Sequence, residues 1–111
     1  MQQKHNIYFY TYGSDEKFPY QFGWTEIEAP DWSTAHRAFR AFHPSRDNAR
    51  VLNCADFYTE DEFKYAFPDA NNLGKGCHER ITVEVYTDVM DDSGNVIHET
   101  IGYRREVLDN A

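Results

Sequence analysis

The chain has no long hydrophobic run and very little cysteine. Its apolar stretches fall far short of the ~20 residues of a membrane-spanning helix, and residues 1–6 do not have the pattern of a secretory signal peptide. Two cysteines, Cys54 and Cys77, are too few for a disulfide scaffold, which fits a reducing compartment. We therefore expect a soluble, cytoplasmic protein with no membrane partner.

Basic residues are also scarce. The sequence has 11 Lys and Arg against 19 Asp and Glu, a net charge of −8. Binding nucleic acid through its phosphates requires a basic surface, so a direct nucleic-acid partner is not expected. Two interpretations of the acidity remain open. In the first, the negative charge only keeps the protein soluble. In the second, clustered carboxylates imitate a phosphate backbone and occupy a basic groove on another protein.

The spacing patterns of metal and phosphate sites are missing as well. No C-x-x-C or H-x-x-x-H pair exists, so Cys54, Cys77, His78 and His98 could bind zinc only if the fold gathered them. The acidic residues lack calcium-loop spacing, and Gly74-Lys75-Gly76 lacks the rest of a phosphate-binding loop. We predict no metal, no cofactor and no catalytic residue.

What the chain does contain is a clear strand-to-helix unit. Residues 24–29 alternate between polar and less polar side chains, which indicates a strand with one wet face. Pro30 ends this strand because it has no N–H to donate to a sheet, and Asp31 can cap the helix that follows. The apolar stripe of that helix is Trp32, Ala35, Ala38, Phe39 and Phe42, with His36, Arg37, Arg40 and His43 off the stripe and Pro44 after the end.

Shorter patterns predict the remaining elements. Residues 7–12 form a first strand, 51–58 a third and central strand, and 80–87 with 96–103 a hairpin around a turn at 91–95. Thr59 and Glu62 have the spacing of a capping box, which predicts a short second helix. We therefore predict one α+β domain over residues 1–111. It is a single layer of about five mostly antiparallel strands, with a main helix (31–43) packed on a face and a second helix (59–67).

Aromatic residues are abundant, with 8 Tyr and 8 Phe. The first strand places Tyr8, Tyr10 and Tyr12 on one face, which we expect to pack beneath a helix or loop rather than to stack on bases. The loop FPYQFGW, residues 18–24, has two open interpretations. It closes one end of the core, or it exposes an aromatic patch for a partner through Phe18, Tyr20, Phe22 and Trp24.

One pair of residues suggests chemistry. Cys77 and His78 are adjacent, and an imidazole can lower the pKa of a thiol nucleophile. In a strand, however, neighbouring side chains point to opposite faces. A small enzyme or metal-binding protein centred on this pair therefore stands as the alternative hypothesis.

Five short sequence segments resemble segments of known proteins: YTYGSD (residues 10–15), FPYQFGW (18–24), EAP (28–30), LNCA (52–55) and NLGKGCHE (72–79). In combination they resemble short proteins encoded in phages and prophages of Firmicutes, over about residues 8–79. The resemblance implies a mobile-element context and no particular catalytic residue. Small acidic accessory proteins of such elements often bind and block a host defence protein, as anti-CRISPR proteins do.

The leading hypothesis is a non-enzymatic inhibitor in the cytoplasm of a bacterial host. Its partner would be a host protein with a basic groove, a nuclease or another defence factor. The predicted contact residues are the acidic clusters Glu60, Asp61, Glu62, Asp88, Asp91 and Asp92, with the aromatic anchors Phe18, Tyr20, Phe22 and Trp24. A phage structural or assembly component is a further alternative, and the sequence leaves the oligomeric state open.

Overall fold

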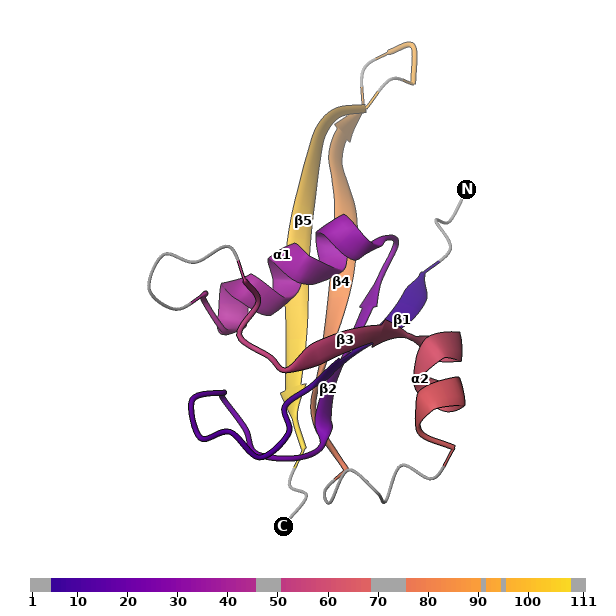
Figure 1. Ribbon diagram of the computed structural model, residues 1–111. Helices are drawn as coiled ribbons and strands as arrows, with labels where there is room; N and C mark the ends of the chain where they lie inside the picture. The colour runs from indigo at the N-terminus through magenta and orange to yellow at the C-terminus, as the bar shows by residue number, and fades with distance from the viewer. Residues whose placement is uncertain (1–4, 46–50, 69–75, 91, 95, 109–111) are drawn as a thin grey trace.

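Five strands and two helices form an α+β fold around one mixed sheet (Figure 1). The computed structural model describes residues 5–45, 51–68, 76–90, 92–94 and 96–108, with the backbone alone at 85–90 and 96–100. The elements are β1 (Asn6–Thr11), β2 (Trp24–Ala29), α1 (Trp32–Phe42), β3 (Asp56–Thr59), α2 (Glu60–Ala66), β4 (Cys77–Met90) and β5 (Val96–Val107). The strand order is β3-β1-β2-β4-β5, in which β2 and β4 are parallel and the other neighbours antiparallel. The predicted fold class is confirmed.

Helix α1 covers one face of the sheet. It begins as predicted, because the backbone N–H of Thr34 donates to Asp31 Oδ1 at 2.7 Å. The helix buries Phe39 against the sheet, and this ring stacks on Tyr10 with centroids 4.7 Å apart. The core below the helix comprises Tyr8, Tyr10, Tyr12, Ile27, Ala29, Ile81 and Val83. The prediction that the tyrosine face packs under a helix is therefore confirmed.

The prediction that His36 and His43 lie off the buried stripe of the helix was wrong, because both side chains turn toward the sheet. His43 follows Phe39 by four residues, so it lies on the same side of the helix, and only 9% of it is exposed. His36 is half-buried, with Nδ1 2.9 Å from the hydroxyl of Tyr10. Both polar rings have a hydrogen-bond partner, which makes their burial tolerable.

Helix α2 packs on the opposite face. Thr59 and Glu62 form the predicted capping box at its start. Phe63 is its buried residue, stacked on Phe9 at 4.2 Å and 5.2 Å from Trp24 between ring centroids. Phe9 and Trp24 alternate with the residues of the α1 core, so α2 builds a second, smaller aromatic core beneath the sheet.

The prediction of a central third strand over 51–58 was wrong. Strand β3 covers Asp56–Thr59 only, and it pairs with β1 at the edge of the sheet. The segment before it contributes Leu52 and Cys54 to the core without sheet pairing along its length, while Val51 is 72% exposed. Leu52 and Cys54 therefore reflect burial of single side chains in the main core, a pattern that resembles a buried strand in sequence.

The predicted C-terminal hairpin is present and longer than expected at both ends. Strand β4 pairs with β2 only as far as Thr82, and beyond this point its one neighbour among the described residues is β5. In Figure 1 the hairpin extends well past the rest of the sheet, and the molecule measures 54 Å along its longest axis.

Candidate functional site

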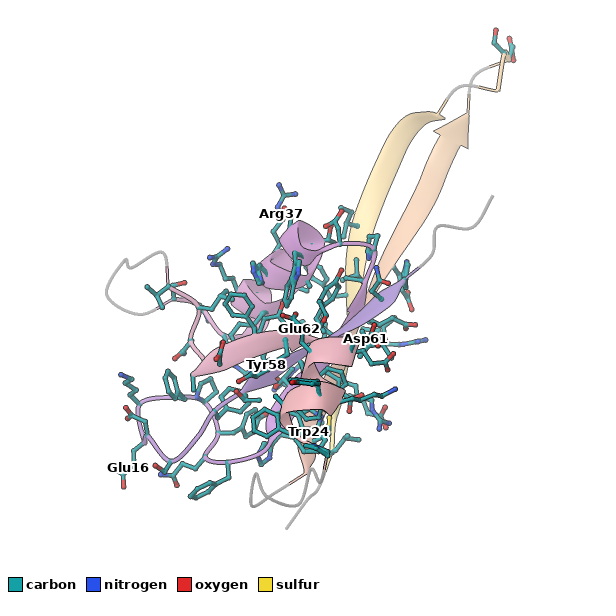
Figure 2. The ribbon with its side chains drawn as sticks, turned by 45° about the vertical axis from the view of Figure 1, so that its right-hand side comes forward. Glu16, Trp24, Arg37, Tyr58, Asp61 and Glu62 are labelled. Carbon is teal, nitrogen blue, oxygen red and sulfur yellow. The ribbon has the colours of Figure 1, made fainter. Side chains whose placement is uncertain are left out.

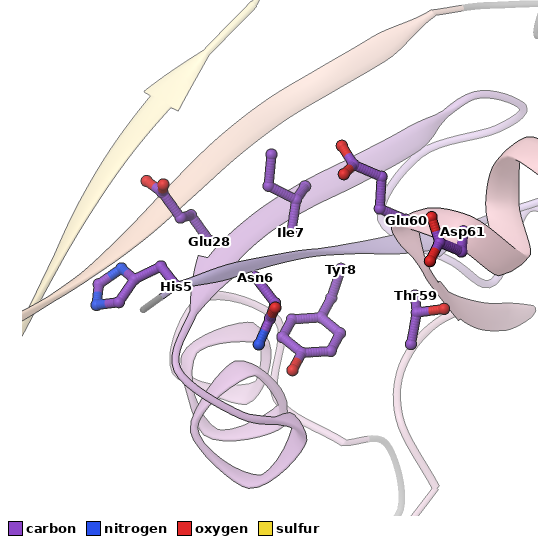
Figure 3. A pocket seen from close by; sticks show the side chains of 8 residues that line it. All are labelled: His5, Asn6, Ile7, Tyr8, Glu28, Thr59, Glu60 and Asp61. Atoms are coloured by element: carbon purple, nitrogen blue, oxygen red, sulfur yellow. The ribbon is translucent and has the colours of Figure 1, made fainter. Parts of the chain in front are cut away.

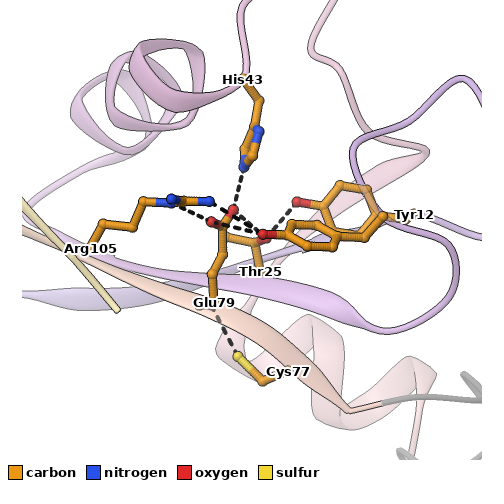
Figure 4. A network of polar contacts seen from close by, with 7 residues as sticks. Tyr12, Thr25, His43, Cys77, Glu79 and Arg105 are labelled. Atoms are coloured by element: carbon orange, nitrogen blue, oxygen red, sulfur yellow. Dashed lines mark hydrogen bonds and ion pairs between the residues drawn. The ribbon is translucent and has the colours of Figure 1, made fainter. Parts of the chain in front are cut away.

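A buried carboxylate, Glu79, is the centre of the polar network in Figure 4. Its Oε1 accepts hydrogen bonds from His43 Nε2 and from the Thr25 hydroxyl, the latter at 2.9 Å. Its Oε2 accepts from Arg105 Nε at 2.7 Å and from the Tyr20 hydroxyl at 3.5 Å. The four donors come from α1's C-terminal cap, from β2, from β5 and from the loop after β1.

The partners of Glu79 decide its charge. Burial opposes ionisation of the carboxyl, but the hydrogen bonds from His43, Arg105 and Thr25 and the charge of His43 hold its pKa below the usual range. The Thr25 hydroxyl uses its one proton on Glu79, so the Tyr12 hydroxyl must donate to Thr25. All four acceptor positions of the carboxylate are occupied, which suits a structural tie between elements better than a general base.

Sequence reasoning missed this network, although one signal pointed to it. Glu79 has the same parity as Ile81 and Val83, so a strand that begins at residue 79 or earlier, rather than at 80, places it on the buried face. Nothing in the sequence indicated that Arg105, 26 residues away, would reach it.

Cys77 and His78 interact with different partners. The Cys77 thiol is buried and donates to the backbone carbonyl of Glu79 at 3.1 Å, and burial raises its pKa to about 12. The His78 ring stacks on Tyr20 with centroids 4.5 Å apart, and its Nε2 lies 2.6 Å from the carbonyl oxygen of Phe22. Cys54 is also a free, buried thiol whose pKa burial raises to about 12. These surroundings disfavour thiolate formation at either cysteine.

Three of the four aromatic residues of the loop at 18–24 pack inward, as the core-closing interpretation predicts. Phe18 and Tyr20 pack against the core, and Trp24 packs on Phe63. Phe22 is different, because it is 43% exposed and has a positive φ of 61°. Such a backbone is costly for a bulky residue, and it is held here by hydrogen bonds from the Phe22 N–H to Gly13 O and between Phe22 O and His78. Phe22 is the one exposed anchor of the four.

The predicted acidic contact residues separate into different environments. Glu62 is committed to the capping box, where its carboxylate accepts from the backbone N–H of Thr59 at 3.0 Å. Asp61 is exposed and Glu60 half-buried, with Glu60 at 4.0 Å from Lys64. Asp92 is exposed at the hairpin turn. The side chain of Asp88 and the whole of Asp91 lie outside the described residues.

Glu60 and Asp61 line an open hollow of about 610 Å³ together with a third carboxylate, Glu28 on β2 (Figure 3). Ile7, directly opposite Glu28 in the β1–β2 register, stands between Glu28 and Glu60 in this view. The remaining lining residues are His5, Asn6, Tyr8 and Thr59. Within the described chain, Glu28 and Asp61 have no cationic partner. Glu28 was missed from the sequence because only the sheet order brings β2 close to the start of α2 across β1.

Comparison with protein-family models, with curated proteins and with solved structures gave no match. Neither helix in the described part of the chain has the length and apolar composition for crossing a membrane. The described residues also contain no group of three or more His, Cys, Asp and Glu placed to hold a metal ion.

Proposed function

We propose that this protein acts by binding, and that it receives basic side chains of a partner protein in the hollow formed by Glu28, Glu60 and Asp61. The observation that carries the proposal is that three carboxylates, one from β2 and two from α2, line one open hollow. The resemblance to phage proteins suggests which kind of partner this is. The partner would be a host defence protein with a basic groove, such as a nuclease, inhibited in the bacterial cytoplasm.

The chemistry of the hollow fits an arginine or lysine side chain. Ile7 offers apolar surface for the methylene stem, and the flanking carboxylates of Glu28 and Glu60 can accept from the cationic head. An overall charge of −8 would add long-range attraction to a basic partner. Such attraction weakens as salt screens it, over a Debye length of about 8 Å at physiological ionic strength.

The buried groups favour binding over catalysis as the function. Glu79 has hydrogen-bond donors on both oxygens, and the Cys77 thiol is protonated at neutral pH because its pKa is raised to about 12. Neither group offers a free base or nucleophile to a substrate. This reasoning supports the leading hypothesis over the one centred on Cys77 and His78.

The test begins with capture of a partner from nuclease-treated lysate of a Firmicute host, followed by affinity measurement with the purified partner. Glu28→Lys and Asp61→Lys should each weaken binding at least about tenfold, as expected when a cation loses its carboxylate. Glu16→Lys is the matched control, because it makes the same charge change on an exposed loop well apart from α2 (Figure 2). If all three variants weaken binding equally, or if none of them weakens it, the hollow is not the binding site.

A further inference from the structure

The free edge of the sheet is unusually long. β5 is the last strand in the sheet order, and it spans 12 residues, against 4 in the other edge strand, β3. Its outer backbone groups have no strand to pair with in the described chain. Three apolar side chains along it, Ile101, Tyr103 and Val107, are 43%, 37% and 59% exposed. A long edge with apolar surface is a template for pairing with another strand.

Charged residues cross the face of the sheet opposite α1 in rows that end at this edge. One row consists of Glu26, Arg80 and Glu106 on β2, β4 and β5, with Arg80 Nε 3.6 Å from Glu26. The next row consists of Glu28, Thr82 and Arg104 on the same strands. The two rows therefore reach the free edge with opposite charges, two residues apart on β5.

We propose that the partner at this edge is a second copy of the chain, whose β5 pairs antiparallel with the first about a two-fold axis at Arg105. In this register Arg104 of each copy lies directly opposite Glu106 of the other, because antiparallel partners sum to a constant residue number. The joined row would read Glu26, Arg80 and Glu106, then Arg104, Thr82 and Glu28 of the second copy. Opposite charges directly across neighbouring strands stabilise a sheet.

The α1 face of the same register is also complementary. Tyr103 of each copy lies opposite Val107 of the other, so the two exposed apolar side chains would cover each other. Arg105 of one copy lies opposite Arg105 of the other. Each guanidinium, however, is bonded to Glu79 of its own chain at 2.7 Å and lies over the ring of Phe42. The carboxylate of Glu79 thus offsets the repulsion between the two guanidinium groups.

The surface beside the edge has room for the contact. A hollow of about 370 Å³ is lined by Arg80, Thr82, Arg104, Arg105 and Glu106. The Glu106 carboxylate of the second copy would enter next to Arg104, where it can accept two hydrogen bonds from the guanidinium group. This inference is independent of the proposed function, because the acidic hollow lies at the other side of the sheet order, by β1, β2 and α2.

The test is the mass in solution of the full chain over a range of concentrations, measured by sedimentation equilibrium. The wild-type chain should dimerise, and Arg104→Glu and Glu106→Arg should each raise the dimer Kd at least about tenfold, because each places like charges opposite one another. An equimolar mixture of the two variants should dimerise again, since every pair of facing side chains at positions 104 and 106 then carries opposite charges. Arg37→Glu on α1 is the control with the same charge change as Arg104→Glu, and it should leave the dimer intact.

Rescue in the mixture separates an intermolecular contact from a folding defect. The internal contacts of each variant are the same alone and in the mixture, so only contacts between chains can restore the dimer. A wild-type chain that remains monomeric at all concentrations would overturn the inference. A dimer that Arg104→Glu does not weaken, or a mixture that does not recover, would overturn it as well.

Discussion

Arg105 donates from Nε to Oε2 of Glu79 at 2.7 Å, although the two residues are diagonal neighbours on β4 and β5 rather than a direct cross-strand pair. With His43 and Thr25 on the other oxygen, this contact joins the sheet to the end of α1. Glu79 is fully buried, so its partners replace all the water that an exposed carboxylate would have.

Replacing the Glu79 carboxylate should therefore be costly. Glu79→Gln keeps the shape but leaves His43 and Arg105 without their anion, and we expect it to lower the free energy of unfolding by about 3 kcal/mol. Denaturant unfolding measures this. Glu16→Gln is the matched control on an exposed loop, and it should change stability by less than about 0.5 kcal/mol. Equal effects of the two variants would contradict a structural role for Glu79.

The free energy of unfolding should depend on pH through the titration of Glu79. The pKa of Glu79 is lower in the folded state than the ordinary value of 4.5, so the unfolded state binds the proton more tightly. The contribution of the Glu79 carboxylate to the free energy of unfolding is complete above its pKa in the unfolded state. It is lost as the pH falls through its pKa in the folded state. We expect the stability difference between wild type and Glu79→Gln to shrink as pH falls from about 5 to about 3. A difference that stays constant over this window would contradict the assignment.

The turn at Phe22-Gly23 should tolerate no side chain at Gly23. Its φ is +71°, and a Cβ there would lie 2.8 Å from His78 Nε2 and also meet the carbonyl of Gly76. We expect Gly23→Ala to cost at least about 2 kcal/mol, from left-handed backbone and steric overlap together. Gly13→Ala is the control with φ +65° but ordinary contact distances, and it should cost only about 1 kcal/mol. Thermal unfolding of the two variants compares them, and equal losses would argue against the overlap.

The two thiols should be inert in the native protein. Burial raises the pKa of both Cys54 and Cys77 to about 12, so thiolate is scarce at neutral pH and the sulfurs are shielded. A thiol reagent at pH 8 should label them only as fast as the chain unfolds, and denaturant should release both. Rapid labelling of Cys77 in the folded protein would revive the thiol hypothesis.

Local patterns predicted much of the fold. The alternation in β2, the Asp31 cap and the Thr59–Glu62 capping box each depend on neighbours in sequence, and each appears as expected. The segment 51–58 failed because burial of Leu52 and Cys54 in the main core imitates a central strand. Sheet order depends on contacts between distant residues, which one sequence does not display.

The candidate site was predicted only in part for the same reason. The acidic run at the start of α2 was visible, but its third carboxylate, Glu28, depends on the β1–β2 register. Glu62 is one of the predicted contact residues, yet its spacing from Thr59 already assigns its carboxylate to the helix cap. Among the four aromatic residues of the loop, exposure of Phe22 alone follows from backbone turns and packing that composition does not specify.

Binding of basic side chains in the hollow is tested by a backbone amide NMR titration with a short arginine-rich peptide, in wild type and in Glu28→Lys. We predict shifts confined to the hollow, at Ile7, Glu28, Thr59 and Asp61, which salt reverses and the variant loses. Saturable shifts elsewhere, or equal shifts in the variant, would contradict the hollow as a site for basic side chains.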